Sequence, residues 1–227
     1  DLQFKWSAAS RSDLFGNPKT SYENRRRVAE MMKQAGCRSA GFSLESGNPE
    51  ILKMMNKRVR PEWFSEQIRI LNEVGITSMT SAVFGYPIET KETIRETFAM
   101  CLSNRVYPSI GFLMPLPYTD MYQHAKEHGF ITDEDAYLTQ VTERQDWVLN
   151  MTQLSDEEVM AEIKAGATEL NRQLELGLDD DSLIRTGGYR NHTSRKRGLD
   201  PEQIERNQND FSFNYSEAVF DENRGNT

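Results

Sequence analysis

The chain has 227 residues, with 35 acidic and 27 basic side chains and a formal net charge of −8. This acidic balance argues against a protein that coats nucleic-acid phosphates, because such binding needs a basic surface. Mean hydropathy is −0.69, and no run of about 18 apolar residues occurs, so no membrane-spanning segment is expected. Cys37 and Cys101 are far apart in sequence, and this sparse usage is typical of a reducing, cytoplasmic setting.

Strand-like and helix-like segments alternate along the first half of the chain. The segments with strand patterns are residues 4–9, 39–44, 77–84 and 109–114. Their starts are separated by the length of one strand-plus-helix unit, which predicts an α/β fold with parallel strands and right-handed crossovers. Both a barrel and a doubly wound sheet fit this pattern, and in either one ligands bind at the carboxyl ends of the strands.

The helix after the first strand has its own start and stop signals. Thr20 and Glu23 predict a capping box, and Gly36 predicts the end of the helix. The helical period predicts an inward face made of Val28, Met31, Met32 and Ala35.

The next helices are signalled by their first residues. Pro61 suits a first helical turn, Thr90 and Thr119 suit N-caps, and Gly75 and Gly129 suit helix ends. The residues expected to face inward from two of these helices are Phe64, Ile68, Leu71, Ile94, Phe98, Cys101 and Leu102.

The pattern changes after Gly129, which predicts a helical extension over residues 132–178. Ser155 and Glu158 predict a capping box for a long helix that ends at Gly177. Its predicted inward face is Val159, Ile163, Ala167, Leu170 and Leu174. Residues 132–151 are expected to be mostly helical, and the polar tail 179–227 is expected to be largely disordered. Residues 1–131 would then be the main domain.

Polar residues follow the second strand, where Glu45 and Ser46 precede the N-cap-like pair Asn48–Pro49. A carboxylate and a hydroxyl beside a helix N-terminus suit recognition of an amine, a ribose or an anion. A loop glutamate that faces solvent fits the same position equally well.

Arg11 follows the first strand, and its guanidinium could bind a carboxylate in a bidentate manner. A surface arginine paired with Asp13 is the better interpretation if Arg11 is taken alone. His124 and His128 are one helical turn apart, as metal-ligating pairs can be, but no third ligand accompanies them and solvated histidines are favoured. We therefore expect no metal ligand.

Glycine and proline residues follow the last two strands. Gly85 and Pro87 end the third strand, and Pro115 and Pro117 end the fourth. Glycine lets a flat ligand approach the backbone and proline fixes a turn, although both residue types also simply end strands.

Four segments resemble the second part of a radical SAM (S-adenosylmethionine) domain. They are WSAASRSD (6–13), AGCRSAGFSLESGNPEILKMMNK (35–57), GITSMTSAVFGYPIETKETIRET (75–97) and IGFLMPLPYTDMYQHAKEHGFI (110–131). The resemblance is greatest to the group whose members often carry an N-terminal cobalamin-binding domain, such as the anaerobic magnesium-protoporphyrin ester cyclases and related methylases.

The resemblance implies a partial (β/α) barrel, of which about four of six units are present. In the family, a reduced four-iron four-sulfur cluster cleaves SAM to a 5′-deoxyadenosyl radical, or a cobalamin takes part in methylation. The SAM contacts that it implies are Arg11, Ser43, Glu45, Ser46, Gly85, Pro87, Pro115 and Pro117. Glu45 and Ser46 would contact the amino or ribose group and Arg11 the carboxylate, while the glycine and prolines would shape the adenine site. No residue of this chain is expected to be catalytic or to bind metal.

Two features depart from the family pattern. The CxxxCxxC cluster motif and the first two strands are absent, and without three thiolates a cluster cannot be bound. Tyr118 replaces a glycine after the last strand, which is tolerable if Tyr118 avoids positive φ. We therefore expect a fragment, inactive alone, whose partners are the missing N-terminal barrel segment and a small-molecule substrate, with no nucleic acid.

Two alternatives to this fragment remain. The first is a complete, cluster-less scaffold or binding module that kept the fold and lost the chemistry. The second, which the four matching segments disfavour, is an unrelated α/β enzyme that uses Glu45 and Arg11.

Overall fold

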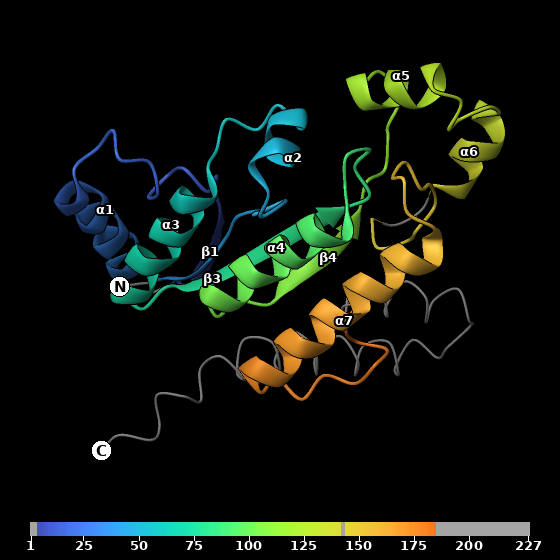
Figure 1. Cartoon of the computed structure of the whole chain (residues 1–227). Helices are drawn as coiled ribbons and strands as arrows, with labels where there is room; N and C mark the ends of the chain where they lie inside the picture. Colours follow the sequence, from blue (N-terminus) through green and yellow to red (C-terminus); the bar gives the residue numbers. More distant parts are fainter. Residues whose placement is uncertain (1–3, 142–143, 185–227) are drawn as a thin grey trace.

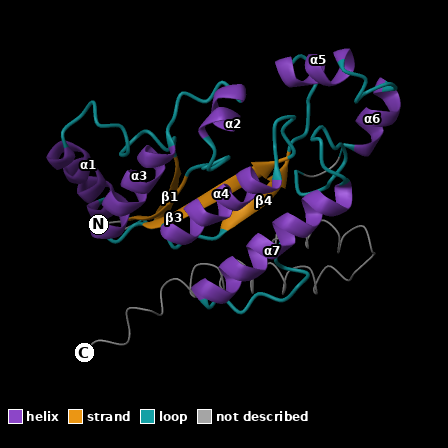
Figure 2. Cartoon of the chain, viewed as in Figure 1, coloured by secondary structure: helices purple, strands orange, loops and turns teal. Residues whose placement is uncertain are grey.

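The computed structural model describes residues 4–141 and 144–184 of the chain. Within them, four strands form one parallel sheet, in the order β1-β2-β3-β4. Figure 2 shows the sheet in orange beside the purple helices. The strands are β1 (Trp6–Ala9), β2 (Cys37–Gly41), β3 (Thr77–Phe84) and β4 (Pro108–Phe112). Spatial order follows chain order, whereas a doubly wound sheet reverses at a switch point. The predicted α/β fold with a partial barrel is therefore confirmed.

The helices connect and cover the strands. They are α1 (Tyr22–Gln34), α2 (Pro49–Met54), α3 (Pro61–Glu73), α4 (Lys91–Ser103), α5 (Asp120–Glu127), α6 (Glu134–Gln140) and α7 (Asp156–Leu174). Pro61, Thr90 and Thr119 start α3, α4 and α5 as predicted, and the Thr90 side chain accepts a hydrogen bond from the Thr93 amide. No helix in the described ranges is long and apolar enough to cross a membrane.

The two faces of the sheet have different chemistry because side chains alternate along each strand. One face packs under the helices, where Phe84 of β3 stacks on Phe98 of α4 with ring centroids 5.5 Å apart. The residues that alternate with these buried positions are Ser7, Ser39, Gly41, Ser43, Met79, Ser81, Val83, Ser109 and Gly111. We call this second set the serine face. Most of its residues are serine or glycine, with Met79 and Val83 among them, and most of these residues are partly exposed.

Helix α1 differs from its predicted form. Its N-cap is Ser21, whose side chain accepts a hydrogen bond from the Asn24 amide, and not Thr20. Its buried residues are Arg25 and Ala29, and the predicted inward residues Val28 and Met31 are 42% and 55% exposed.

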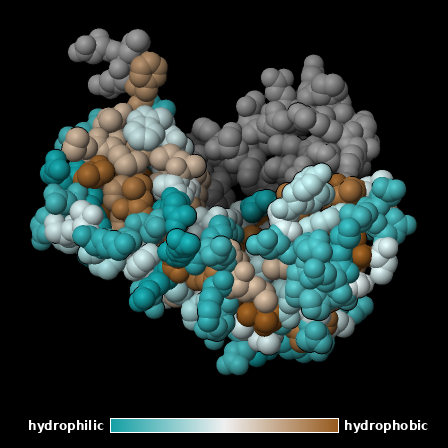
Figure 3. Space-filling view, turned by 90° about the horizontal axis from the view of Figure 1, so that it is seen from above, coloured by the Kyte–Doolittle hydropathy of each residue, from teal (hydrophilic) through white to brown (hydrophobic). Residues whose placement is uncertain are grey.

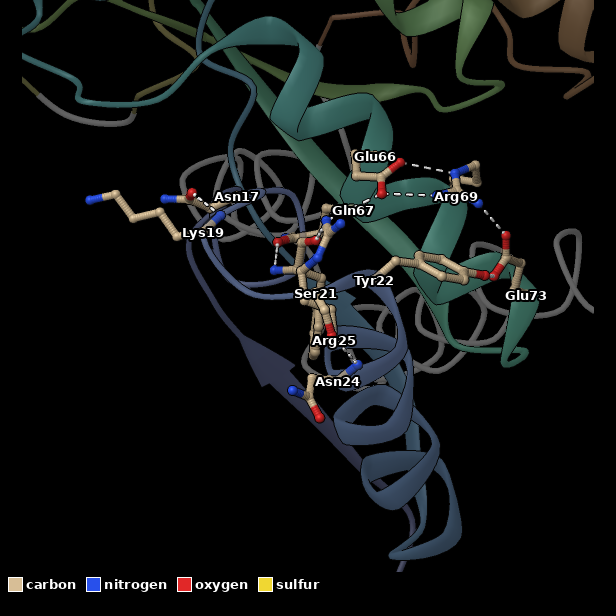
Figure 4. A network of polar contacts seen from close by, with 11 residues as sticks. Asn17, Lys19, Ser21, Tyr22, Asn24, Arg25, Glu66, Gln67, Arg69 and Glu73 are labelled. Atoms are coloured by element: carbon tan, nitrogen blue, oxygen red, sulfur yellow. Dashed lines mark hydrogen bonds and ion pairs between the residues drawn. The ribbon is translucent and has the colours of Figure 1, made fainter.

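A polar network explains this rotation of α1 (Figure 4). The Arg25 guanidinium donates to the Phe15 carbonyl at 2.5 Å and lies 3.2 Å from the Glu66 carboxylate of α3. Because this buried arginine faces α3, the buried stripe of α1 runs through Arg25 and Ala29, and Val28 and Met31 are exposed to solvent. A tertiary ion pair has therefore outweighed the hydrophobic period of the helix.

The C-terminal extension packs on the outside of the helical layer. Helix α7 begins with the predicted Ser155–Glu158 capping box and lies beside α4 (Figure 1). Its buried residues are Val159, Ile163, Ala167 and Leu170, as predicted. The helix ends at Leu174, with Glu175 in the left-handed region at φ 57°, and so before the predicted Gly177.

The structure also bears on the predictions for residues 132–151 and for the tail that begins at residue 179. In the described part of residues 132–151 the only helix is the short α6, so the prediction of mostly helical structure there is wrong. Leu183 is buried in the core, and its carbonyl accepts a 2.5 Å hydrogen bond from the Tyr107 hydroxyl. The predicted polar tail from residue 185 onward lies outside the described residues.

Candidate functional site

Glu45 leaves the sheet in a strained conformation. Its φ is 65°, in the left-handed region that side chains other than glycine rarely adopt. Two backbone hydrogen bonds to β3 hold it there, from the Glu45 amide to the Ser81 carbonyl (3.1 Å) and from the Val83 amide to the Glu45 carbonyl (2.8 Å). Strain of this kind, fixed by the surrounding ladder, is frequent at ligand-binding positions.

The Glu45 side chain lies among groups from neighbouring elements. Its carboxylate is 2.8 Å from the Lys57 ammonium, beyond the end of α2, and the side chain is 15% exposed. Burial, together with the negative charges of Glu45 and Glu89, raises the pKa of Tyr86 well above its usual range. Glu45, Lys57 and Tyr86, which we call the Glu45 cluster, therefore join the exits of β2 and β3.

The turn after β3 is organised by a buried carboxyl group. Gly85 has a φ of 104°, and its amide donates to a carboxylate oxygen of Glu89 at 2.5 Å. Burial raises the pKa of Glu89 to about 7. The other carboxylate oxygen, Oε1, is buried without a hydrogen-bond partner in the described structure. Pro87 lies half-buried in the same turn.

Trp147 of the C-terminal extension covers the backbone of Gly85. A Cβ atom built on Gly85 would lie 3.1 Å from the Trp147 ring, and the ring packs edge-on against Phe112 with centroids 5.1 Å apart. The close approach that glycine permits is thus made by an indole of the same chain. A flat ligand at this turn would therefore have to lie beside the Trp147 indole.

The other predicted contacts after β1 and β2 have partners within the protein. Arg11 forms an ion pair with Asp13 at 2.9 Å, and its side chain is 65% exposed, as in the alternative interpretation. Ser46 is buried, and its hydroxyl accepts from the Asn48 amide at 3.1 Å and lies 3.4 Å from Thr97 of α4. Ser43 shares a 2.7 Å hydrogen bond with Ser81 on the serine face.

The exit of β4 leads toward α5 and α6 (Figure 1). Pro115 is buried, and its carbonyl accepts a hydrogen bond from the Tyr137 hydroxyl at 2.8 Å, while Pro117 is exposed. Tyr118 has a φ of 67°, so the condition under which tyrosine would replace the family's glycine without strain is not met. The side chain of Tyr118 is fully exposed, and no packing compensates the strain. Figure 3, which looks down on this end of the molecule, shows separate hydrophobic spots among hydrophilic side chains.

A comparison with protein families supports the relationship that the strand exits suggest. Residues 17–101, which contain Glu45 and Gly85, match the model of the radical SAM superfamily. This segment of the chain is therefore similar to the radical SAM superfamily. The match covers the α1–α4 region, in which the Glu45 cluster is built.

Curated relatives are similar over a longer stretch. The chain is 26% identical over 125 residues to an uncharacterized methyltransferase of Pyrococcus horikoshii, covering 55% of this chain and 25% of the relative. It is 27% identical over 140 residues to bacteriochlorophyllide d C-12(1)-methyltransferase of Chlorobaculum tepidum, covering 61% and 29%. The chain therefore spans less than a third of the length of either relative.

A solved structure supports the fold. The radical SAM enzyme coproporphyrinogen III oxidase of Escherichia coli superimposes with a TM-score of 0.51 at 14% sequence identity. The superposition covers 74% of this chain and 32% of that one. The described sheet is thus similar to part of a radical SAM barrel.

The residues of this chain do not fit the iron–sulfur cluster of the radical SAM superfamily. A cluster of this kind needs several cysteine thiolates, and the chain has two cysteines. Both are buried, and burial raises the pKa of Cys101 to about 12. The described residues hold no group of three or more histidine, cysteine or acidic side chains that could bind a metal, and His124 and His128 instead lie with ring centroids 4.0 Å apart.

Glu89, Trp147 and Arg144 of the site region were not singled out from the sequence. The Arg144 carbonyl accepts a hydrogen bond from the Phe112 amide at 2.7 Å, and its guanidinium donates to Ser109 Oγ at 2.5 Å. No local motif surrounds Arg144, so only the fold brings it to β4. The alternating serines of β2 and β3, by contrast, were a readable signal for a second, polar face.

Proposed function

We propose that this chain forms the second half of a radical SAM catalytic domain and binds SAM at the carboxyl ends of β2 and β3. The observation that carries the proposal is Glu45, a strained residue whose carboxylate lies in a small polar cluster at a strand exit. SAM presents an ammonium group and ribose hydroxyls, both of which a carboxylate binds well. Tyr86 beside Glu45, and Trp147 over Gly85, offer aromatic surfaces for the adenine.

The reaction that we propose for the whole enzyme is methylation of a small molecule. The printed names of the two curated relatives, both methyltransferases, support this. Reductive cleavage of SAM, or methyl transfer by way of cobalamin, would be supplied by cofactors held outside the described residues. This chain's own contribution is to bind and orient SAM, since hard chemistry of this kind belongs to the cofactor.

Calorimetric titration of the full chain with SAM tests the proposal. Glu45→Gln keeps the shape of the side chain and removes its charge, so we expect about tenfold weaker SAM binding. The control is Glu50→Gln on α2, whose side chain is 70% exposed and 3.7 Å from Lys53. Equal SAM affinity of the wild type and Glu45→Gln, or no binding by the wild type, would contradict the proposal.

A further inference from the structure

Arg144 lies on the serine face, although it belongs to the extension that follows the barrel units. The hydrogen bond from the Phe112 amide to the Arg144 carbonyl places residue 144 along the outer edge of β4. From there the side chain reaches back across the strand to Ser109. A Cβ atom on Gly111 would lie 3.2 Å from Arg144 Nη1, so the glycine leaves room for the guanidinium.

The charge of Arg144 is not balanced within the described residues. Several arginines there have carboxylate partners, including Arg11 with Asp13 and Arg95 with Glu162. Arg144 forms no such ion pair in the described ranges, and its hydrogen-bond partner at Ser109 is a neutral hydroxyl. A guanidinium fixed at one end by a hydroxyl has further N–H groups to donate.

A row of serine hydroxyls extends across the sheet from the Arg144 guanidinium. Ser109 of β4 is in register with Ser81 of β3, and the Ser81 hydroxyl shares a 2.7 Å hydrogen bond with that of Ser43. Adjacent strands are about 4.8 Å apart, so a group bound to Arg144 could also accept from the Ser81 hydroxyl. The arrangement places the planar, positively charged Arg144 guanidinium beside neutral serine hydroxyls, and this combination of donors suits a carboxylate.

We propose that Arg144, with Ser109 and Ser81, forms a carboxylate-binding subsite on the serine face. Two sources present this chemistry, namely a carboxylate of the small-molecule substrate and the methionine carboxylate of SAM. The inference rests on the proposed function, because it takes the serine face as the face that meets ligands. It also assigns to Arg144 the role that the sequence suggested for Arg11, whose guanidinium Asp13 already occupies.

The test compares wild type, Arg144→Gln and the control Arg27→Gln, an exposed arginine whose described side-chain contact is Met31 Sδ. Each full-length chain is titrated with SAM, with the methyl ester of SAM and with glutarate. If SAM is the source, Arg144→Gln weakens SAM binding about tenfold and the ester does not distinguish the variants. If the source is a separate carboxylate, SAM affinity is unchanged and glutarate affinity falls about tenfold. Either result supports the subsite.

Two results would overturn the subsite. One is that Arg144→Gln binds both SAM and glutarate as the wild type does, and the other is that the wild type binds neither. Failure of the proposed SAM site gives a different pattern, in which Glu45→Gln leaves SAM binding unchanged while Arg144→Gln still loses glutarate. Because the Arg144 side chain is exposed, the variant should keep the thermal unfolding midpoint of the wild type, which identifies any folding defect.

Discussion

Glu89 is the buried carboxyl group that supports the turn after β3. Its pKa is raised from 4.5 to about 7, chiefly by burial, against the lowering effect of the Gly85 and Tyr86 amides and the Thr93 side chain. Between these two pKa values the folded state binds more protons than the unfolded state. Stability is therefore greatest at the low end of this window and falls as pH rises toward about 7.

Replacing Glu89 by glutamine should remove this pH dependence. The amide cannot ionise, and its carbonyl can still accept from the Gly85 amide. From about pH 5 to pH 8, the unfolding free energy of the wild type should fall. This fall should exceed that of Glu89→Gln by at most about 3 kcal/mol. Urea unfolding at a series of pH values measures this, with Glu50→Gln as an exposed control. Parallel pH profiles for the wild type and Glu89→Gln would contradict the assignment.

Tyr118 carries backbone strain without compensating contacts. Its φ is 67° and its side chain is fully exposed. Tyr118→Gly should therefore raise the unfolding free energy by about 0.5–1 kcal/mol. Tyr118→Ala keeps the Cβ atom and with it the strain, so it should bring no comparable gain. A loss of stability in Tyr118→Gly would show that Tyr118 makes a stabilising contact after all.

Helix starts were predictable from short local patterns, but helix orientation was less so. The N-caps Thr90, Thr119 and Ser155 were read correctly, because a cap depends on residues within one turn of it. The inward face of α1 was read wrongly, because it depends on Arg25 meeting Glu66 of another helix. The hydrophobic period cannot report a buried ion pair.

The contact of α4 with α7 predicts the sign of a stability change, because it decides whether Gly166→Ala raises or lowers the unfolding free energy. Glycine to alanine in a helix normally stabilises it by about 1 kcal/mol. At Gly166 of α7 the added Cβ would lie 2.2 Å from the Phe98 ring of α4, so Gly166→Ala should instead cost about 1–3 kcal/mol. The control, Ala165→Gly at an exposed position of the same helix, should cost about 1 kcal/mol. Stabilisation by Gly166→Ala in urea unfolding would refute the close packing.

The whole sheet was largely predictable, since strand-plus-helix spacing determines a parallel order. The strand ends could be named in advance, and with them Glu45 and Gly85, because parallel strands share one exit edge. Arg144 and Trp147 could not be named, since they reach β4 and Gly85 from a segment of irregular structure. The pairing of Arg11 with Asp13, by contrast, was the interpretation favoured for Arg11 taken alone, because the two residues are neighbours in the sequence.

The two cysteines give a prediction for the full chain. After anaerobic reconstitution with iron and sulfide, we expect no stoichiometric iron, because both cysteines are buried in the fold. Iron analysis and visible absorption measure this, with the Cys37→Ala, Cys101→Ala double variant as background. Stoichiometric iron with a charge-transfer band, lost in the double variant, would contradict the conclusion that the residues do not fit a cluster.

Binding of SAM at the strand exits is tested most directly by amide chemical-shift mapping of the full chain during titration with SAM. The predicted result is a set of shifts that saturates together and centres on Glu45, Lys57 and the turn from Gly85 to Glu89. The Glu45→Gln variant should need about tenfold more SAM to reach the same shifts. Saturating shifts centred on α7, or no shifts at any SAM concentration, would contradict a SAM site at the carboxyl ends of β2 and β3.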